Sequence, residues 1–150
     1  MAGLVFKTET HVLMGYQYHK AMISGIGGKA HEFELPVHTA FREAIEELFG
    51  VKPTYWLIVS LAEIFKSAKS VQNEGYTMFI LSFDELTRFM HYVQASVQTS
   101  PYYAKFPESI HDLLLCRRAP PDAEVTHLAL IPLVTDYFRV DQRDIPLIIL

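Results

Sequence analysis

The chain opens with two short apolar runs that predict β-strands. Residues 3–6 (GLVF) and 11–17 (HVLMGYQ) are separated by the polar stretch KTET, which predicts a hairpin between the two strands. Residues 54–65 (TYWLIVSLAEIF) and 76–83 (YTMFILSF) are rich in aromatic and β-branched side chains, so they predict two further strands joined by a polar loop. A last strand is expected at residues 124–133 (EVTHLALIPL).

Between these runs, apolar positions recur with the period of an α-helix. Over residues 37–49 one buried stripe is predicted, and Gly50 stands where that helix should end. The stripe consists of Val37, Ala40, Phe41, Ala44 and Leu48. Ser82 and Glu85 form a capping-box signal before a second amphipathic helix, and residues 107–118 predict a third. Strands interspersed with helices indicate an α/β or α+β domain with a mixed sheet.

Composition narrows the class of protein. A chain of 150 residues that is half apolar and one-fifth charged predicts a single globular domain, residues 1–150. The formal net charge of −4 gives no overall basic field for nucleic acid or membranes. The single cysteine, Cys116, excludes an internal disulfide framework and fits a reducing compartment. Since neither a secretory signal nor a membrane-spanning stretch is found, a cytoplasmic protein with no membrane partner is expected.

Residues 39–50 (TAFREAIEELFG) place three glutamates on one side of the first predicted helix. The three glutamates are neighbours on the helix surface. Glu43 lies three positions before Glu46 and four before Glu47, and Glu46 and Glu47 are adjacent. Like charges at these spacings destabilise a helix by a few tenths of a kcal/mol per pair, roughly. Two interpretations stay open at this point. The glutamates form a solvated acidic face, or a cation holds them together.

The residues before this segment complete a spaced motif. From position 28 the chain reads G-KAHEF-E-LPVHTAF-REAIEE-LF-G. This resembles the Nudix box, G-x5-E-x7-R-E-U-x-E-E-x-G-U, in which U is a bulky aliphatic residue. The matching fixed positions are Gly28, Glu34, Arg42, Glu43, Glu46 and Glu47. A chance match at a given start is on the order of one in ten million. The chain departs from the box at Ala44, which occupies a U position, and by one extra residue before Gly50.

The resemblance implies a Nudix-type α/β/α sandwich with a mixed β-sheet and a Mg²⁺-dependent pyrophosphohydrolase, with Mn²⁺ as a substitute. The family hydrolyses a nucleoside diphosphate linked to another moiety, and hard divalent cations neutralise that crowded anionic linkage. The implied Mg²⁺ ligands are Glu43, Glu46, Glu47 and the carbonyl of Gly28. One of the glutamates, Glu43 by preference, is also expected to orient or deprotonate the attacking water. Arg42 and Glu34 would form an ion pair that locks the loop onto the helix.

Further site residues lie outside the fixed positions. Many family members carry another metal-binding acid before a late strand, and Glu124 fits that place better than Glu74. The double glycine Gly27–Gly28 allows the backbone to turn tightly and approach an ion. Lys29 is placed to meet a phosphate.

Residues 84–121 exceed what a compact domain of this family needs, so a helical elaboration beside the substrate cleft is predicted. Within it, Tyr102 and Tyr103 are candidates to stack on a nucleobase, with packing in the core as the alternative. Trp56, in a predicted strand, is expected in the core.

Three functions stay open. The first is hydrolysis of small nucleotides. The second is mRNA decapping at an RNA 5′ end. Binding of an RNA body usually requires a stripe of basic residues, and the basic residues of this chain are scattered, which argues against decapping. The third is a catalytically inactive Nudix fold that serves as a binding module. The sequence of the box is also similar to that of Nudix proteins of large DNA viruses. A viral origin would place the chain in the host-cell cytoplasm. The apolar tail, residues 144–150, fits a homodimer.

Overall fold

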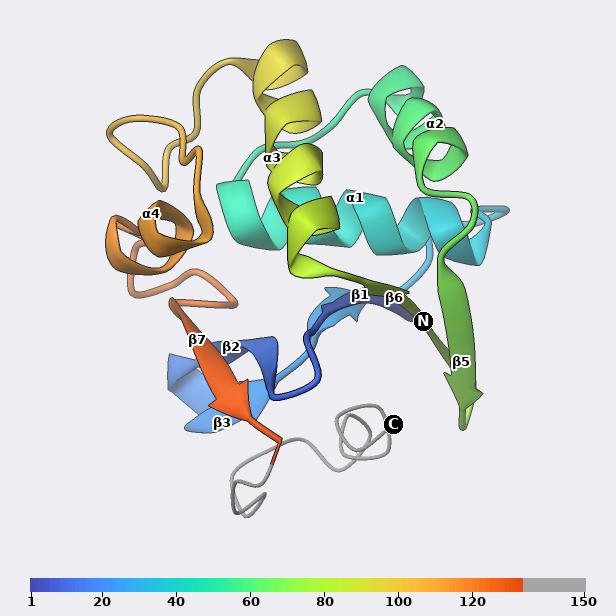
Figure 1. Cartoon of the computed structure of the whole chain (residues 1–150), viewed down its shortest axis with the longest axis horizontal. Helices are drawn as coiled ribbons and strands as arrows, with labels where there is room; N and C mark the ends of the chain where they lie inside the picture. Colours follow the sequence, from blue (N-terminus) through green and yellow to red (C-terminus); the bar gives the residue numbers. More distant parts are fainter. Residues whose placement is uncertain (134–150) are drawn as a thin grey trace.

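The structure is a computed structural model that describes residues 1–133 (Figure 1). Within these residues there are four α-helices and seven β-strands, which confirms the predicted α/β class. In chain order the elements are β1 (Ala2–Phe6), β2 (His11–Gln17), the 3₁₀ turn η1 (Tyr18–Lys20), β3 (Met22–Ser24), β4 (Ile26–Gly28), α1 (Pro36–Phe49), α2 (Tyr55–Ile64), β5 (Lys69–Asn73), β6 (Tyr76–Leu81), α3 (Phe83–Val97), α4 (Ile110–Leu115) and β7 (His127–Pro132). None of these helices is both long and apolar enough to cross a bilayer.

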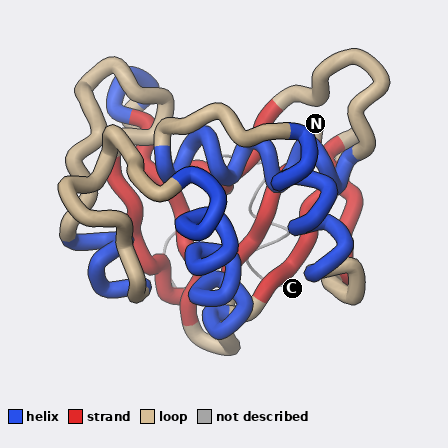
Figure 2. Tube along the Cα trace, turned by 90° about the horizontal axis from the view of Figure 1, so that it is seen from above, coloured by secondary structure: helices blue, strands red, loops and turns tan. Residues whose placement is uncertain are grey.

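The strands form two sheets. The first has the order β4-β1-β6-β5 and is mixed, because β1 runs parallel to β6 but antiparallel to β4. The second has the order β3-β2-β7 and is antiparallel. Figure 1 shows α1, α2 and α3 together on one side of the first sheet, and Figure 2 shows these helices in front of the strands. The helices therefore cover one face, as in an α/β sandwich.

The predicted hairpin between the first two strands is wrong. The strands β1 and β2 belong to different sheets, and the bridge between Lys7 and Val12 is isolated. Both edges of β1 are occupied, by β4 on one side and β6 on the other. The approach of β4 is close, since a Cβ on Gly3 would lie 2.9 Å from the Cα of Gly27. With both edges of β1 taken, the chain carries β2 into the second sheet.

The strand predicted over residues 54–65 is also wrong, since this segment forms α2. The side chain of Thr54 caps the helix by accepting a hydrogen bond from the backbone N–H of Leu57. The buried residues of α2 are Leu57, Ile58 and Leu61, a helical spacing. Trp56 is 75% exposed, so it does not belong to the core. Part of the predicted polar loop that follows is instead the strand β5, which pairs with β6. Aromatic and β-branched residues favour strands only weakly, and here tertiary packing and the cap decide.

Several local predictions are confirmed. Gly50 ends α1 in the left-handed conformation, with φ +66°, and its N–H donates to the carbonyl of Glu46. The extra residue in the box is therefore accommodated before an ordinary glycine cap. The capping box of Ser82 and Glu85 begins α3. The third predicted helix, α4, is shorter than expected, and the apolar tail at residues 144–150 lies outside the described residues.

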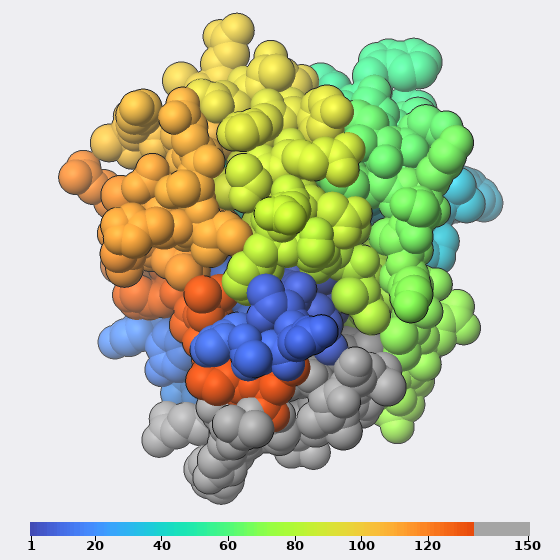
Figure 3. Space-filling model, in the orientation of Figure 1, coloured from blue at the N-terminus to red at the C-terminus, as the bar shows by residue number. Residues whose placement is uncertain are grey.

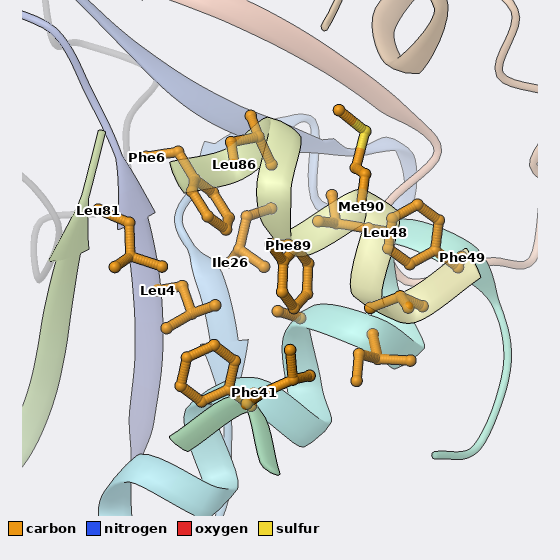
Figure 4. Close-up of a cluster of buried hydrophobic side chains, with 14 of the residues drawn as sticks. Leu4, Phe6, Ile26, Phe41, Leu48, Phe49, Leu81, Leu86, Phe89 and Met90 are labelled. Carbon is orange, nitrogen blue, oxygen red and sulfur yellow. The ribbon is translucent and has the colours of Figure 1, made fainter. Parts of the chain in front are cut away.

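The main core lies between the first sheet and the helices (Figure 4). Phe89 of α3 packs against Phe6 of β1, and it packs against Phe41 and Phe49 of α1, with ring centroids 5.8–6.2 Å apart. The helix α3, inside the predicted elaboration, thus belongs to the core of the domain. Since α1 buries this apolar side, its glutamates face β4 and the loop that follows it.

Candidate active site

Arg42 connects the acidic side of α1 to the loop after β4. Its side chain is 9% exposed and makes a bidentate pair with Glu34, with Nε–Oε2 at 2.8 Å and Nη2–Oε1 at 3.0 Å. Its Nη1 donates to Glu43 at 3.0 Å and to Glu46 at 2.7 Å, and its Nη2 donates to the carbonyl of Lys29 at 2.8 Å. The expected ion pair between Arg42 and Glu34 is therefore present, and the guanidinium uses its whole donor fork.

The Glu34 carboxylate is held ionised. Burial by itself would raise its pKa, but hydrogen bonds from Arg42, from the Thr39 hydroxyl and from the His31 backbone N–H lower the pKa to about 2. The hydrogen bond to Glu34 in turn raises the pKa of Arg42. The pair stays charged over the whole range in which proteins are ordinarily folded, so the loop is fixed electrostatically to α1.

Glu47 is the most confined of the glutamates. The residue is 7% exposed, and its Oε2 has no hydrogen-bond partner among the described residues. The backbone N–H of Gly27 bonds to the carboxylate. Burial raises the pKa of Glu47 well above its usual value, and the nearby carboxylates of Glu124 and Glu43 raise it further. An unpartnered acceptor that two other carboxylates repel is the place where a cation would be most stabilising.

Glu43 packs directly onto the glycine at the end of β4. A Cβ on Gly28 would come within 2.6 Å of both carboxylate oxygens of Glu43, so a larger residue here would displace that carboxylate. Burial raises the pKa of Glu43, Arg42 opposes that shift, and Glu46 and Glu124 add to it. The contact places the Glu43 carboxylate of α1 directly against the end of β4.

Gly28 and Glu43 border a polar cavity of about 480 Å³. Carboxylates of Glu43 and Glu124 line it, as do the glycines of β4. Lys20 and Lys29 also line it, and neither ammonium group has an ion-pair or hydrogen-bond partner within residues 1–133. The structure thus brings together the expected residues Gly27, Gly28, Lys29, Glu43 and Glu124. Sequence reasoning missed Lys20, which follows β2 in a turn without a recognisable motif.

The donor set suits a hard divalent cation. Carboxylate oxygens and backbone carbonyls are the ligands that Mg²⁺ prefers, and Glu47 Oε2 is a buried oxygen without a partner. No group of three or more acidic, histidine or cysteine side chains in residues 1–133 has the arrangement of a ready metal site. Glu43 and Glu46 each share an oxygen with Arg42 Nη1. Metal binding by Glu43, Glu46, Glu47 and Glu124 therefore stays a prediction.

Two residues expected to contact substrate have structural contacts elsewhere. Tyr103 is 5% exposed and donates its hydroxyl to the carbonyl of Leu113 at 2.6 Å. The ring of Tyr102 packs on Gly50 and lies 4.9 Å from the guanidinium of Arg117. Neither tyrosine lines the polar cavity. The stacking role predicted for Tyr102 and Tyr103 is corrected to packing around the end of α1, because the loop before α4 folds back on that helix.

Arg117 is a positioning residue that sequence reasoning did not find. Its Nη1 donates to the carbonyl of Leu48 and its Nη2 to that of Glu47, both at 2.6 Å. Its Nη2 also donates to the carbonyl of Val125 at 2.9 Å. The last carbonyls of a helix lack partners within the helix and carry partial negative charge, so a guanidinium stabilises them. Arg117 thereby joins the end of α1 to the segment that presents Glu124.

We expect Arg117→Ala to lower the free energy of unfolding by about 2 kcal/mol, because three carbonyls lose a charged donor. Urea denaturation would measure the loss. The neighbouring exposed Arg118 has no side-chain partner among the described residues, so Arg118→Ala should change stability by less than about 0.5 kcal/mol. Equal denaturation midpoints for the two variants would contradict the capping role.

Comparison with models of protein families gives no match, and comparison with curated proteins gives none either. Function is therefore inferred from the spacing of the motif residues and from the cavity that Gly28 and Glu43 border.

Proposed function

We propose that the chain is a divalent-cation-dependent pyrophosphohydrolase of the Nudix type that cleaves a nucleoside diphosphate linked to another moiety. One observation supports this most. The buried Oε2 of Glu47 has no partner within residues 1–133 and lies beside two further carboxylates, Glu43 and Glu124. These two carboxylates line a cavity together with Lys20 and Lys29, which have no ion-pair partner in the same part of the chain. A solvated acidic helix face would not bury a carboxylate in this way.

The cations would be held by Glu43, Glu47 and Glu124, with the Gly28 carbonyl as a backbone ligand. When bound, Mg²⁺ neutralises the pyrophosphate and lowers the pKa of a bound water. Lys20 and Lys29 would bind the outer phosphate oxygens, since ammonium groups stabilise phosphates as point charges. The two lysines and the carboxylates face one cavity, so substrate phosphates and cations would meet there.

Arg42 separates the roles of the glutamates. It holds one oxygen of Glu43 and one of Glu46, so these side chains are fixed in direction. Glu47 Oε2 has no such donor. Glu47 Oε2 is therefore the oxygen best able to bind a cation, and Glu43, which lines the cavity, is the carboxylate that would orient or deprotonate the attacking water.

The test is Mg²⁺- or Mn²⁺-dependent turnover on a mixed panel. The panel would hold nucleoside triphosphates, oxidised nucleoside triphosphates, nucleotide sugars, dinucleoside polyphosphates and a cap-labelled RNA. Product release should require the metal, disappear in Glu47→Gln and persist in Glu63→Gln. Glu63 is a matched control because its side chain is 72% exposed on α2 and pairs with Lys66. A folded protein that turns over none of these substrates with either metal would overturn the proposal and favour a binding module.

A further inference from the structure

Of the eight large hydrophobic side chains that are exposed within residues 1–133, four gather on one surface, here called the apolar patch. Phe33 and Leu35 come from the loop before α1, and Tyr55 and Trp56 come from the first turn of α2. The rings of Tyr55 and Trp56 meet edge-on at 5.7 Å, and Phe33, Leu35 and Tyr55 line one hollow. Figure 3 shows the loop, in light blue, beside α2, in green, at the right of the molecular surface. Contiguous apolar surface of this kind marks an interaction site.

Phe33 is held in an outward position by the loop itself. The residue is 96% exposed, and its backbone is left-handed with φ +62°, a conformation that is unfavourable for a bulky side chain. The backbone N–H of Glu34 donates to the carbonyl of His31, and the Glu34 carboxylate accepts from the backbone N–H of His31. Arg42 in turn holds Glu34 on α1. Because the turn is fixed on both sides of Phe33, a partner would find the ring already in place.

The apolar patch contains a hollow as well as this protruding ring. The hollow measures about 280 Å³ and lies between the loop and α2, with His38 and Ile58 among its lining residues. His38 packs edge-on against Tyr55, with ring centroids 6.0 Å apart. A surface that carries both a protruding ring and a hollow is suited to contact its own copy about a two-fold axis, because each ring can then enter the hollow of the other molecule.

The exposed apolar area is large enough for such a contact. An aromatic side chain buries about 150–250 Å² when it is fully covered. At their exposures of 96%, 63% and 75%, Phe33, Tyr55 and Trp56 could together bury about 350–600 Å² per molecule. Two molecules would bury about 700–1,200 Å² from these rings alone, against about 1,200–2,000 Å² in a specific interface. Leu35 and the polar residues around the hollow would supply the rest.

The charges around the apolar patch do not select a partner of one sign. Glu32 lines the hollow, and Lys52 lies exposed just before α2. A two-fold contact can bring charges of opposite sign on the two molecules together. An anionic membrane would instead favour a cluster of basic residues, and the net charge of this chain is −4. A second copy of the chain therefore fits this surface better than a lipid bilayer does.

We propose that the apolar patch binds a second copy of this chain, with Phe33 of each molecule in the hollow of the other. The contact does not depend on the proposed hydrolysis, since none of the four patch residues lines the polar cavity. It reaches the candidate site only through the loop, because Phe33 directly precedes Glu34, the carboxylate that Arg42 holds. Association would cover the loop that joins β4 to α1.

Sedimentation equilibrium of the full chain would measure the association. The unsubstituted protein should form dimers within a concentration range of about 1–200 µM. Phe33→Ser/Trp56→Ser should raise the dissociation constant at least about tenfold, since large apolar side chains at the centre of an interface contribute most to binding. The matched control is Tyr18→Ser/Leu115→Ser, which removes two exposed apolar side chains outside the patch. A monomer throughout this range, or equal dissociation constants for the two double variants, would overturn the proposal.

Phe33→Gly tests the same contact with little risk to the fold. Glycine adopts a positive φ without strain, and this gain offsets the entropy that glycine loses on folding. The melting temperature of the monomer should therefore stay within about 3 °C of the unsubstituted value, while the dissociation constant of the dimer rises at least about fivefold. An unchanged dissociation constant in the folded variant would overturn the proposal.

Trp56 is the only tryptophan of the chain, so its fluorescence reports directly on the apolar patch. As the protein concentration rises through the dissociation constant, its emission should shift to shorter wavelength and its quenching by acrylamide should fall at least about twofold. Phe33→Ser should move this change to higher concentration, whereas Tyr18→Ser should not. Dimers in which acrylamide quenches Trp56 as strongly as in the monomer would place the interface elsewhere and overturn the proposal.

Other results would identify a different occupant or separate the two proposals. A monomeric chain whose Trp56 emission shifts on adding vesicles of phosphatidylcholine and phosphatidylserine would overturn the dimer in favour of a membrane surface. Dimers that depend on Phe33 and Trp56, together with no turnover on any substrate of the panel, would remove the proposed hydrolysis and support the interface. Turnover by a chain that stays monomeric would do the reverse.

Discussion

Glu47→Gln should slow Mg²⁺-dependent turnover by about 10²–10³-fold, the range expected when an electrostatic stabiliser of the reacting centre is lost, here a carboxylate that would hold the cation. The same substitution should stabilise the metal-free protein. Glu47 is buried, its Oε2 has no partner among residues 1–133, and Glu43 and Glu124 repel it. A glutamine has the same shape, and its amide N–H can donate to those carboxylates. The expected gain is about 1–3 kcal/mol, or about 2–4 °C of melting temperature per kcal/mol for a chain of this size.

The gain should depend on pH in a defined direction. Folding raises the pKa of Glu47, so the folded state binds its proton more tightly than the unfolded state does. Stability from this group is fully present below the unfolded value of 4.5 and is lost as pH rises through the folded pKa. The advantage of Glu47→Gln should therefore vanish near pH 4.5 and grow as pH rises toward neutrality.

Thermal melts in EDTA at several pH values would measure this effect, with Glu63→Gln as the exposed control. Adding Mg²⁺ should raise the melting temperature of the unsubstituted protein and leave that of Glu47→Gln nearly unchanged, since ligand binding stabilises only the state that binds. A Glu47→Gln variant that melts below the unsubstituted protein at pH 7 would show that the carboxylate is satisfied without a cation.

Arg42→Ala should be the most destabilising substitution at this site. It removes the partner of a buried carboxylate, Glu34, whose side chain is 13% exposed, and leaves that charge without a counterion. Breaking a buried pair in this way costs about 3–5 kcal/mol, which corresponds to a fall of roughly 10 °C in melting temperature. Turnover should fall as well, because Glu43 and Glu46 lose the donor that directs them.

Two control variants test whether the loss depends on the burial of the ion pair and on the shape of the guanidinium. Lys66→Ala removes an ion pair of similar length, 3.0 Å, whose side chains are 71% and 72% exposed, and it should cost less than about 1 kcal/mol. Arg42→Lys keeps the charge but not the planar fork, so an intermediate loss is expected. If Arg42→Ala and Lys66→Ala proved equally stable, the buried pair would not fix the loop.

Acid titration gives an independent check on the same pair. The folded pKa of Glu34 is about 2, below its ordinary value of 4.5. Its contribution to stability is therefore present above pH 4.5 and is lost as pH falls toward 2. The unsubstituted protein should lose this stability in that range, and Arg42→Ala should not. Denaturation curves between pH 5 and about 2 would show the difference.

Local signals in the sequence were sufficient to predict the helix that carries the candidate site, α1. The apolar stripe of α1 and the glycine stop at Gly50 depend on contacts a few positions apart, so they can be read along the chain. The spacing between Glu34 and Arg42 likewise places both ends of one ion pair within a single loop and helix. The capping box that starts α3 is local as well.

Only the tertiary structure decided the rest, because it depends on partners far away in the chain. Residues 54–65 form α2 and not a strand, since packing outweighs weak propensities in a segment apolar enough for either. The edges of β1 go to β4 and β6, which no pattern near residue 6 could indicate. Arg117 meets a carbonyl 70 positions earlier, at Glu47. The sequence by itself determined which carboxylates gather on α1. Within residues 1–133, the fold determined which of them has a buried oxygen without a partner, and which lysines line the polar cavity.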